Sequence, residues 1–126
     1  MICENEPDLL LTYTTMLSSE YSVITTSSGM QCLETYVQKK NDGQTIDIIL
    51  LDYKLGDMNG DLVAKAIMTL NGTTRIILIS AYEIDPETIR ELFRNKIIVG
   101  FLSKPFSSTL LKESIKRLII DSRTRI

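Results

Sequence analysis

The chain has 126 residues, with 14 Lys plus Arg against 16 Asp plus Glu, two Cys, no His and 44% apolar residues. Without an imidazole the protein cannot use Ser-His-Asp or Cys-His catalysis, HExxH zinc hydrolysis or any His-ligated metal. The length predicts a single domain that needs no disulfide or structural metal, and the net charge of −2 lacks the basic excess of nucleic-acid-binding domains, so we expect no direct nucleic-acid partner.

No part of the sequence has the pattern of a membrane segment. The first seven residues are acidic rather than basic, and no apolar run approaches the ~20 residues of a spanning helix. We therefore expect a cytoplasmic protein with no membrane contact. Cys3 and Cys32 lack Cys-x-x-Cys spacing, and we expect both to be free thiols.

Short apolar stretches alternate with helical patterns along the chain. Strands are predicted at residues 1–3, 21–26, 46–51, 75–79 and 97–102. Helices are predicted to begin at Pro7, Ser28, about residue 60, Asp85 and Ser107. In the second helix, Ser28 and Gln31 have the spacing of a capping box, and we expect Met30, Leu33 and Val37 on the buried face.

Strands that alternate with single helices predict a parallel sheet. The stretches at 46–51 and 75–79 are almost wholly apolar, which is typical of strands covered on both faces. Five such units predict a doubly wound α/β domain with right-handed crossovers. We expect residues 1–120 to form this domain and residues 121–126 to be a C-terminal tail or the start of a linker.

Polar residues follow four of the predicted strands. Glu4 and Asn5 follow the first strand, Asp52 the third, Ser80 the fourth and Lys104 the fifth. Ligands of an open doubly wound sheet bind at the carboxyl ends of its strands, so these residues should converge at one edge. Two carboxylates and an amide suit Mg²⁺. Asp52 can attack phosphorus, and Lys104 and Ser80 can hold phosphoryl oxygens, so the set indicates an acyl-phosphate site.

Each of these residues alone also has an ordinary structural explanation. Asp52 could simply open a loop, Lys104 could belong to a solvated turn, and Glu4 could be a charge at a helix entry. Four polar groups at four strand ends are hard to obtain by chance. We therefore favour the functional interpretation of the set.

The same residues resemble the receiver domain of two-component response regulators across nearly the whole chain. The loop from Asp52 to Gly60 is similar to the family's phosphoacceptor loop, in which Gly follows the Asp by eight positions. Ser80 begins a pair similar to its Thr/Ser-Ala, and residues 101–105 are similar to its aromatic-x-x-Lys-Pro signature. The resemblance implies a flavodoxin-like, or CheY-like, fold with a five-stranded parallel sheet in the order 2-1-3-4-5 and five helices.

The resemblance also implies the chemistry of the site. Asp52 would accept a phosphoryl group from the phosphohistidine of a sensor histidine kinase or a phosphotransfer protein, and Ser80 and Lys104 would hold the phosphoryl oxygens. The implied ligands of Mg²⁺ are Glu4, Asn5, Asp52 and the backbone carbonyl of Lys54. Such a domain is not an enzyme, although it assists its own Mg²⁺-dependent phosphotransfer and dephosphorylation.

A receiver domain transmits its signal through a change of shape. The resemblance implies that Ser80 moves toward the phosphoryl group and that Phe101 then rotates inward, which changes the face made by the fourth helix, the fifth strand and the fifth helix. At rest, Phe101 is explained equally well as a core aromatic. The implied partners are an output domain or effector protein, and a second copy in a homodimer formed on phosphorylation.

The sequence departs from the family pattern in the site and its loop. Asn5 replaces a second acidic residue, so we expect weakened Mg²⁺ binding. Gly56 replaces a common proline, which should loosen the loop. Asp57, Asn59 and Gly60 have the composition of a turn or cap, which is explanation enough for Asn59 and Gly60.

One other function stays open at this point, and a second is disfavoured by the sequence. A pseudo-receiver, which keeps the fold but works as an interaction module without phosphate, is favoured by Asn5. An aspartyl-phosphate hydrolase of the dehalogenase type needs Asp-x-Asp, whereas this chain has Asp52-Tyr53-Lys54.

The sequence also departs from one subfamily of receivers outside the site. Val99-Gly100 replaces an acidic pair of receivers attached to winged-helix domains, so we do not expect the charged dimer interface of that subfamily.

Overall fold

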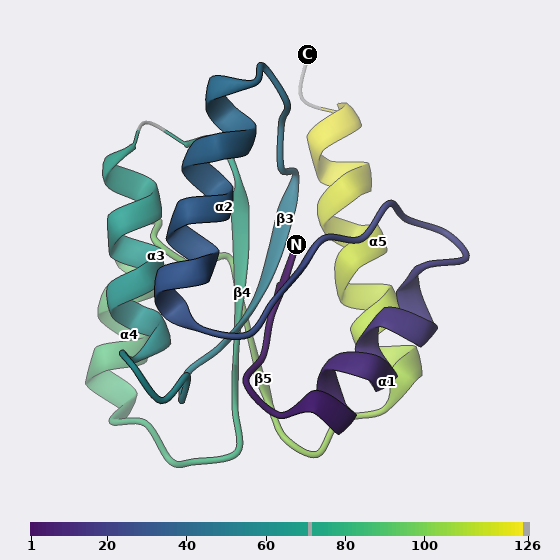
Figure 1. The fold of residues 1–126 in the computed structure, drawn as a ribbon. Coiled ribbons are helices and arrows are strands. Elements are labelled where there is room, and N and C mark those ends of the chain that lie inside the picture. Colours follow the sequence, from purple (N-terminus) through teal and green to yellow (C-terminus); the bar gives the residue numbers. More distant parts are fainter. Residues whose placement is uncertain (71, 125–126) are drawn as a thin grey trace.

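The computed structural model of the chain describes residues 1–70 and 72–124, and within them five short strands alternate with five helices (Figure 1). The elements are β1 (Ile2–Cys3), α1 (Pro7–Leu17), β2 (Thr25–Thr26), α2 (Gly29–Asn41), β3 (Ile48–Asp52), α3 (Gly60–Thr69), β4 (Arg75–Ser80), α4 (Pro86–Arg94), β5 (Gly100–Ser103) and α5 (Ser108–Thr124). All strand pairs are parallel, in the order β2-β1-β3-β4-β5. The predicted fold and strand order are confirmed.

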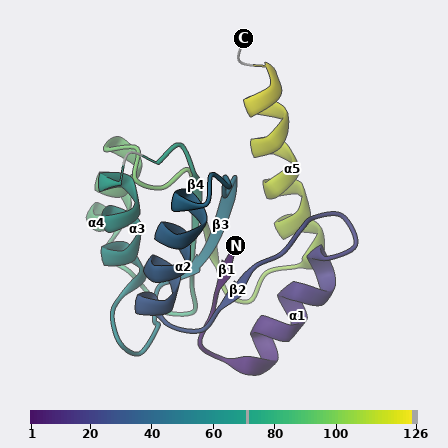
Figure 2. The ribbon, with the colours of Figure 1, turned by 45° about the horizontal axis from the view of Figure 1, so that its top comes forward.

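Helices cover both faces of the sheet. Figures 1 and 2 show α2, α3 and α4 on one side of the strands and α1 and α5 on the other. The central strands supply both cores, because successive side chains of a strand point to opposite faces. Ile49 and Leu51 pack toward α2 and α3, whereas Leu50 packs toward α1 and α5. This explains why β3 and β4 are apolar without alternation.

Every strand differs from its predicted bounds by at least one residue, and two of them start three or four residues later than predicted. The strand predicted at 21–26 is reduced to Thr25–Thr26, because β1 offers only Ile2 and Cys3 as pairing partners. The strand predicted at 97–102 begins at Gly100. The amides of Ile97 and Ile98 instead donate to Leu92 O and close the end of α4, after Lys96 has turned the chain with a φ of 59°.

The start of α2 is as predicted, but its buried face is not. Ser28 Oγ accepts a hydrogen bond from the amide of Gln31 at 3.0 Å. Met30 and Val37, expected to be buried, are 51% and 39% exposed. The buried face carries Cys32 and Tyr36, and Leu33 packs partly buried beside them. The prediction was right for Leu33 and wrong for Met30 and Val37, so the predicted face is rotated away from the real one.

The end of the predicted domain lies within a helix. The helix α5 continues through residues 121–124, while residues 125–126 lie outside the described part of the chain. The boundary at residue 120 therefore stays a prediction. In the described residues no helix has the length and apolar character needed to cross a membrane.

Candidate functional site

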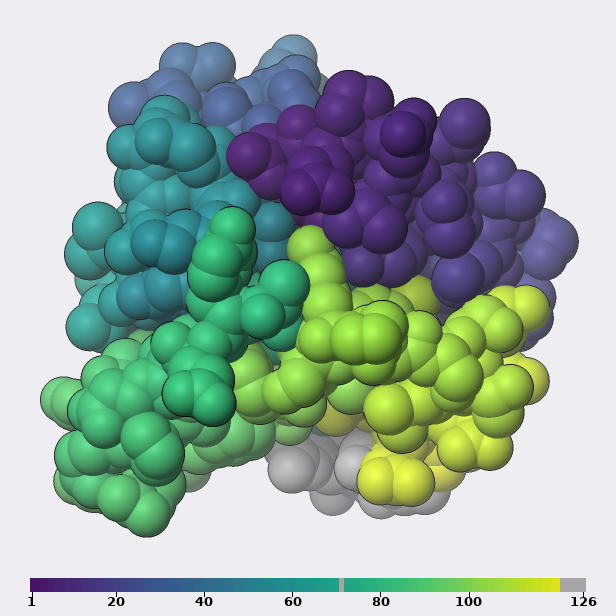
Figure 3. Space-filling model, turned by 90° about the horizontal axis from the view of Figure 1, so that it is seen from below, coloured from purple at the N-terminus to yellow at the C-terminus, as the bar shows by residue number. Residues whose placement is uncertain are grey.

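Three charged residues from separate elements meet at the carboxyl ends of the strands. Glu4 follows β1, Asp52 ends β3 and Lys104 follows β5. The Lys104 Nζ donates to Glu4 Oε1 at 2.7 Å and lies 3.2 Å from Asp52 Oδ1. Figure 3 shows this end of the molecule, where segments from all parts of the chain come together. The predicted convergence of these three residues is thus present in the fold.

Burial governs the electrostatics of this cluster. Glu4 is 1% exposed and Asp52 is 7% exposed. Desolvation by burial, followed by the hydrogen bond and the negative charge of Glu4, raises the pKa of Asp52 to about 7, against the opposing effect of Lys104. Burial lowers the pKa of Lys104, but the hydrogen bond to Glu4 and the charges of both carboxylates outweigh it, and its pKa is raised. Lys104 therefore stays charged, whereas Asp52 near neutral pH is only partly ionised.

Asn5 lies at the exposed mouth of the cluster. The end of its side chain is 3.0 Å from the carbonyl oxygen of Lys54 and 3.3 Å from Glu4 Oε2. With Nδ2 facing these two acceptors, the amide donates a hydrogen bond to each. With Oδ1 facing them, three oxygens would converge, an arrangement that suits a bound cation.

These oxygens fit the preference of Mg²⁺ for carboxylate, amide and carbonyl ligands. They come from Glu4, Asn5 and Lys54. The carboxyl group of Asp52 lies beside them, because it contacts both the carboxyl group of Glu4 and the ammonium of Lys104. Among residues 1–70 and 72–124 no cluster of three or more His, Cys, Asp or Glu side chains could hold a metal. The amide of Asn5 stands where a third acidic group would be required for such a cluster.

The loop between Asp52 and Gly60 is closed by backbone contacts. The Gly60 amide donates to Tyr53 O at 2.7 Å, and Lys54 pairs with Asn59. A Cβ at residue 60 would overlap with the backbone oxygen of Asp52, so Gly60 does more than end a turn. Gly56 has a φ of 87°, a left-handed conformation that proline cannot adopt.

The predicted switch residues Ser80 and Phe101 lie in β4 and β5, the two strands that lead toward Lys104. Ser80 is buried, and its hydroxyl donates to Tyr82 O at 2.9 Å and accepts from the Tyr82 amide at 3.0 Å. The Lys104 amide donates to Ser80 O at 2.8 Å. Phe101, in β5, is partly buried against the core under α2, α3 and α4. The hydroxyl of Ser80 is thus bonded within its own loop.

A family model for the response regulator receiver domain matches residues 1–116. The chain belongs to this family. A candidate transcriptional regulator of Haloferax volcanii is 25% identical over 122 residues, which is 97% of this chain and 19% of that protein. The receiver domain therefore spans about a fifth of that relative's length.

Solved structures agree on the fold. The receiver domain of a response regulator from Clostridium thermocellum superposes with a TM-score of 0.85 at 18% identity, covering 99% of this chain and 96% of that one. A CheY-like receiver domain protein from Methanospirillum hungatei gives a TM-score of 0.80 at 20% identity, covering 97% and 94%. At these identities the likeness establishes the receiver fold alone.

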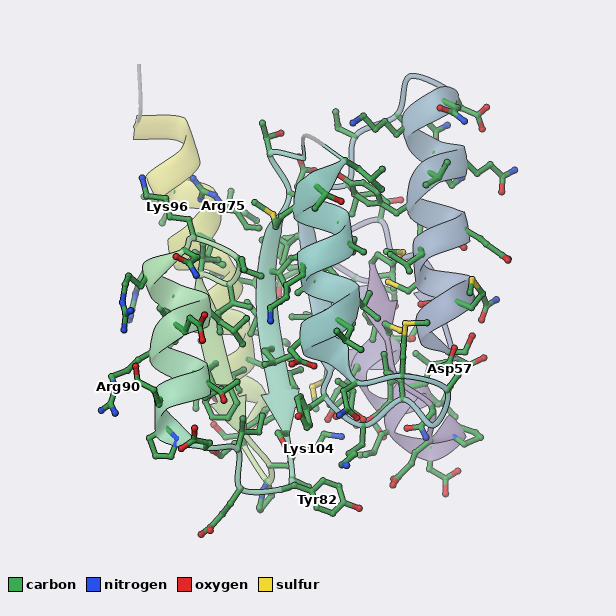
Figure 4. All side chains as sticks on the ribbon, turned by 90° about the vertical axis from the view of Figure 1, so that its left-hand side faces the viewer. Asp57, Arg75, Tyr82, Arg90, Lys96 and Lys104 are labelled. Atoms are coloured by element: carbon green, nitrogen blue, oxygen red, sulfur yellow. The ribbon has the colours of Figure 1, made fainter. Side chains whose placement is uncertain are left out.

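Two features of this receiver domain were missed by sequence reasoning. The Lys54 ammonium lies 5.7 Å from the ring centroids of both Tyr53 and Tyr82, so a cation and two aromatic rings flank the loop. Asp57 binds backbone amides at the start of α2. Figure 4 shows Tyr82, Lys104 and Asp57 toward one end of the sheet, and Arg75 and Lys96 toward the other. No local sequence signal places Tyr82 near Lys54, because the contact joins two separate loops.

Proposed function

We propose that this receiver domain accepts a phosphoryl group on Asp52 from the phosphohistidine of a sensor histidine kinase or a phosphotransfer protein, in the cytoplasm and with Mg²⁺ as cofactor. The observation that carries the proposal is the position of Lys104, whose Nζ lies 2.7 Å from Glu4 Oε1 and 3.2 Å from Asp52 Oδ1. An ammonium held beside a nucleophilic carboxylate can turn to the oxygens of a phosphoryl group bound there. The domain acts as a phosphoacceptor and not as an enzyme.

In the reaction an ionised oxygen of Asp52 attacks phosphorus. The bond from phosphorus to the histidine nitrogen breaks, its electron pair stays with the imidazole, and Asp52 becomes an acyl phosphate. Burial and the neighbouring Glu4 raise the pKa of Asp52 to about 7 even with the ammonium of Lys104 beside it. Further positive charge near Asp52 would therefore help to keep the nucleophile ionised. Mg²⁺, held by Glu4, Asn5, Asp52 and the Lys54 carbonyl, would neutralise charge on the phosphoryl oxygens. The same groups would assist hydrolysis of the acyl phosphate.

The signal would leave the site through Ser80. To bind a phosphoryl oxygen, its hydroxyl must release the backbone of Tyr82, and Phe101 can then turn inward. Exposed apolar side chains in or next to the three elements of the face made by α4, β5 and α5 include Phe93 in α4, Val99 just before β5 and Leu110 in α5. This face would contact an output domain, an effector protein or a second copy of the chain.

The proposal is tested by intact mass after incubation with acetyl phosphate and Mg²⁺, with an acid quench to preserve the acyl phosphate. We expect one phosphoryl group on the wild type and none on Asp52→Asn. The matched control is Asp61→Asn, because Asp61 is a partly exposed carboxylate in the first turn of α3 that bonds only the neighbouring amide of Leu62 in the described contacts. This control should be labelled like the wild type.

An unmodified wild type, under conditions that label an ordinary receiver, would contradict phosphotransfer. It would favour the pseudo-receiver function, in which the fold serves as an interaction module. Asn5 is the feature that keeps this second function under test, because it removes one negative charge beside the proposed cation.

A further inference from the structure

The carboxylate of Asp57 reaches from the phosphoacceptor loop, residues 53–59, to the start of α2. Its Oδ1 accepts a hydrogen bond from the Gly29 amide at 2.9 Å, and its Oδ2 accepts one from the Met30 amide at 2.9 Å. The Met58 amide adds a third bond to Oδ1 at 3.0 Å. These backbone bonds lower the pKa of Asp57, so the side chain is ionised at neutral pH. A charged group thus links two segments that are 28 residues apart.

The neighbouring side chain strengthens the same link. A Cβ at residue 29 would overlap with Met58 Cγ and lie 2.9 Å from Met58 Sδ. Met58 therefore packs directly on the bare Cα of Gly29, and a larger residue there would displace it. Two consecutive residues of the loop hold the first turn of α2.

The helix α2 has a separate local cap. Ser28 Oγ accepts from the Gln31 amide, and the Cys32 amide donates to Ser28 O at 3.0 Å. The first two amides, of Gly29 and Met30, are thus bound by the loop, and the next two by Ser28. This division allows helix capping and loop positioning to be separated by mutation.

Besides its backbone closure, the loop has a point of conformational freedom at Gly56, next to the residue that binds α2. At Gly56 the chain has a φ of 87°, and no proline stiffens it. On one side of Gly56, Leu55 is 2% exposed in the core. On the other side, Asp57 is bonded to α2. The loop itself carries the Lys54 carbonyl, and Asp52 is the residue directly before the loop.

We propose that Asp57 is a positioning residue for the phosphoacceptor site, which holds the loop bearing the Lys54 carbonyl in place by binding the first amides of α2. The inference rests on the proposed function for its consequence at the metal site, but the ordering of the loop can be measured without metal or phosphate. Asp57 does not touch the reacting atoms, and it acts through the backbone of the loop.

The test compares Asp57→Asn with Ser28→Ala, since each removes part of the capping of the same helical turn. The first measurement is amide exchange of residues 53–59 in metal-free protein. We expect Asp57→Asn to exchange at least several-fold faster than the wild type over this loop, and Ser28→Ala to match the wild type there. Equal exchange in the two variants would mean that Asp57 only caps the helix.

The second measurement is the Mg²⁺ concentration that gives half of the maximal rate of labelling by acetyl phosphate. For Asp57→Asn we expect an increase of roughly tenfold, the lower end of what loss of an outer-shell partner costs a metal site. Ser28→Ala should leave it unchanged, whatever its thermal stability. If the wild type takes no label, the proposed function fails, while the exchange result still decides the role of Asp57.

Gly29→Ala provides a second variant that does not weaken the helix. Alanine has the higher helix propensity, but its Cβ must displace Met58. We expect faster exchange of residues 53–59 with α2 itself undisturbed. An unchanged loop in both Gly29→Ala and Asp57→Asn would overturn the proposal.

Discussion

Lys104 and Glu4, which are 100 positions apart in the sequence, form an ion pair with Nζ and Oε1 2.7 Å apart. The pair joins the ends of β1 and β5, so it reaches across β3 and β4 in the sheet. The side chains are 1% exposed in Glu4 and 13% in Lys104. Removing one partner of a shielded pair leaves an uncompensated charge, which costs about 3–5 kcal/mol, whereas an exposed pair contributes about 0–1 kcal/mol. The ion pair between Lys104 and Glu4 should therefore contribute to the stability of the fold as well as to the chemistry of the site.

In Lys104→Ala, phosphorylation of Asp52 should no longer cause the conformational change in the face made by α4, β5 and α5. Asp52 and the oxygen ligands remain, so some phosphorylation should persist, but a charge-assisted contact made only in the phosphorylated state is lost. In the wild type we expect a phosphoryl mimic to change amide exchange or NMR shifts in residues 85–95 and 101–118. In Lys104→Ala this response should be much reduced. A full response in the variant would show that Lys104 does not bind the phosphoryl group.

Asp52→Asn should stabilise the protein at high pH. Because the pKa of Asp52 is raised to about 7, the folded state favours its protonated form, and wild-type stability is lost as the pH rises from about 4 through 7. Asparagine does not titrate, so the variant should gain about 2–4 kcal/mol over the wild type near pH 8, since each pKa unit corresponds to about 1.4 kcal/mol. The gain should shrink toward about pH 4. Urea denaturation at several pH values measures it, and a constant difference across pH would contradict the assigned cause.

Asn5→Asp should tighten Mg²⁺ binding. The amide donates to Lys54 O and Glu4 Oε2, and a carboxylate in its place offers a charged ligand to a cation but repels Glu4. In the presence of a chelator the variant should therefore melt at a lower temperature than the wild type, and added Mg²⁺ should raise its melting temperature by more. The difference should be greatest at low salt. Unchanged affinity would show that Asn5 does not face the cation.

Gly60→Ala should be destabilising even though alanine favours a helix. The new Cβ would overlap with the backbone oxygen of Asp52, and backbone cannot move aside as a side chain can. We expect a loss of about 1–3 kcal/mol in urea denaturation, the usual cost of overpacking. The control is Gly100→Ala, whose Cβ would lie 3.3 Å from Ile77 Cγ1, a side-chain atom in tight contact and not a backbone atom. Equal losses in the two variants would argue against a special approach at Gly60.

The pattern of the residues was sufficient for a parallel α/β architecture and for the convergence at the sheet edge, whereas the strand order was implied by the resemblance to receiver domains. The apolar runs of β3 and β4 indicate a strand covered on both faces, and parallel strands bring their carboxyl ends to one side, so Asp52 and Lys104 had to meet. The link from Asp57 to Gly29 could not be predicted, because it depends on how a loop and a helix pack in space. The exposure of Met30 has the same origin, since periodicity alone did not determine which side of α2 faces the sheet.

In the proposed switch the hydroxyl of Ser80 would exchange its hydrogen bonds to the backbone of Tyr82 for a hydrogen bond to a phosphoryl oxygen. The hydroxyl that would bind a phosphoryl oxygen already makes two hydrogen bonds to the Tyr82 backbone, so only the difference between old and new bonds can drive the change. Tyr82 is 61% exposed, within reach of another protein. By thermodynamic reciprocity, a partner that draws this backbone outward would also favour retention of the phosphoryl group, and phosphorylation would increase affinity for that partner by the same factor.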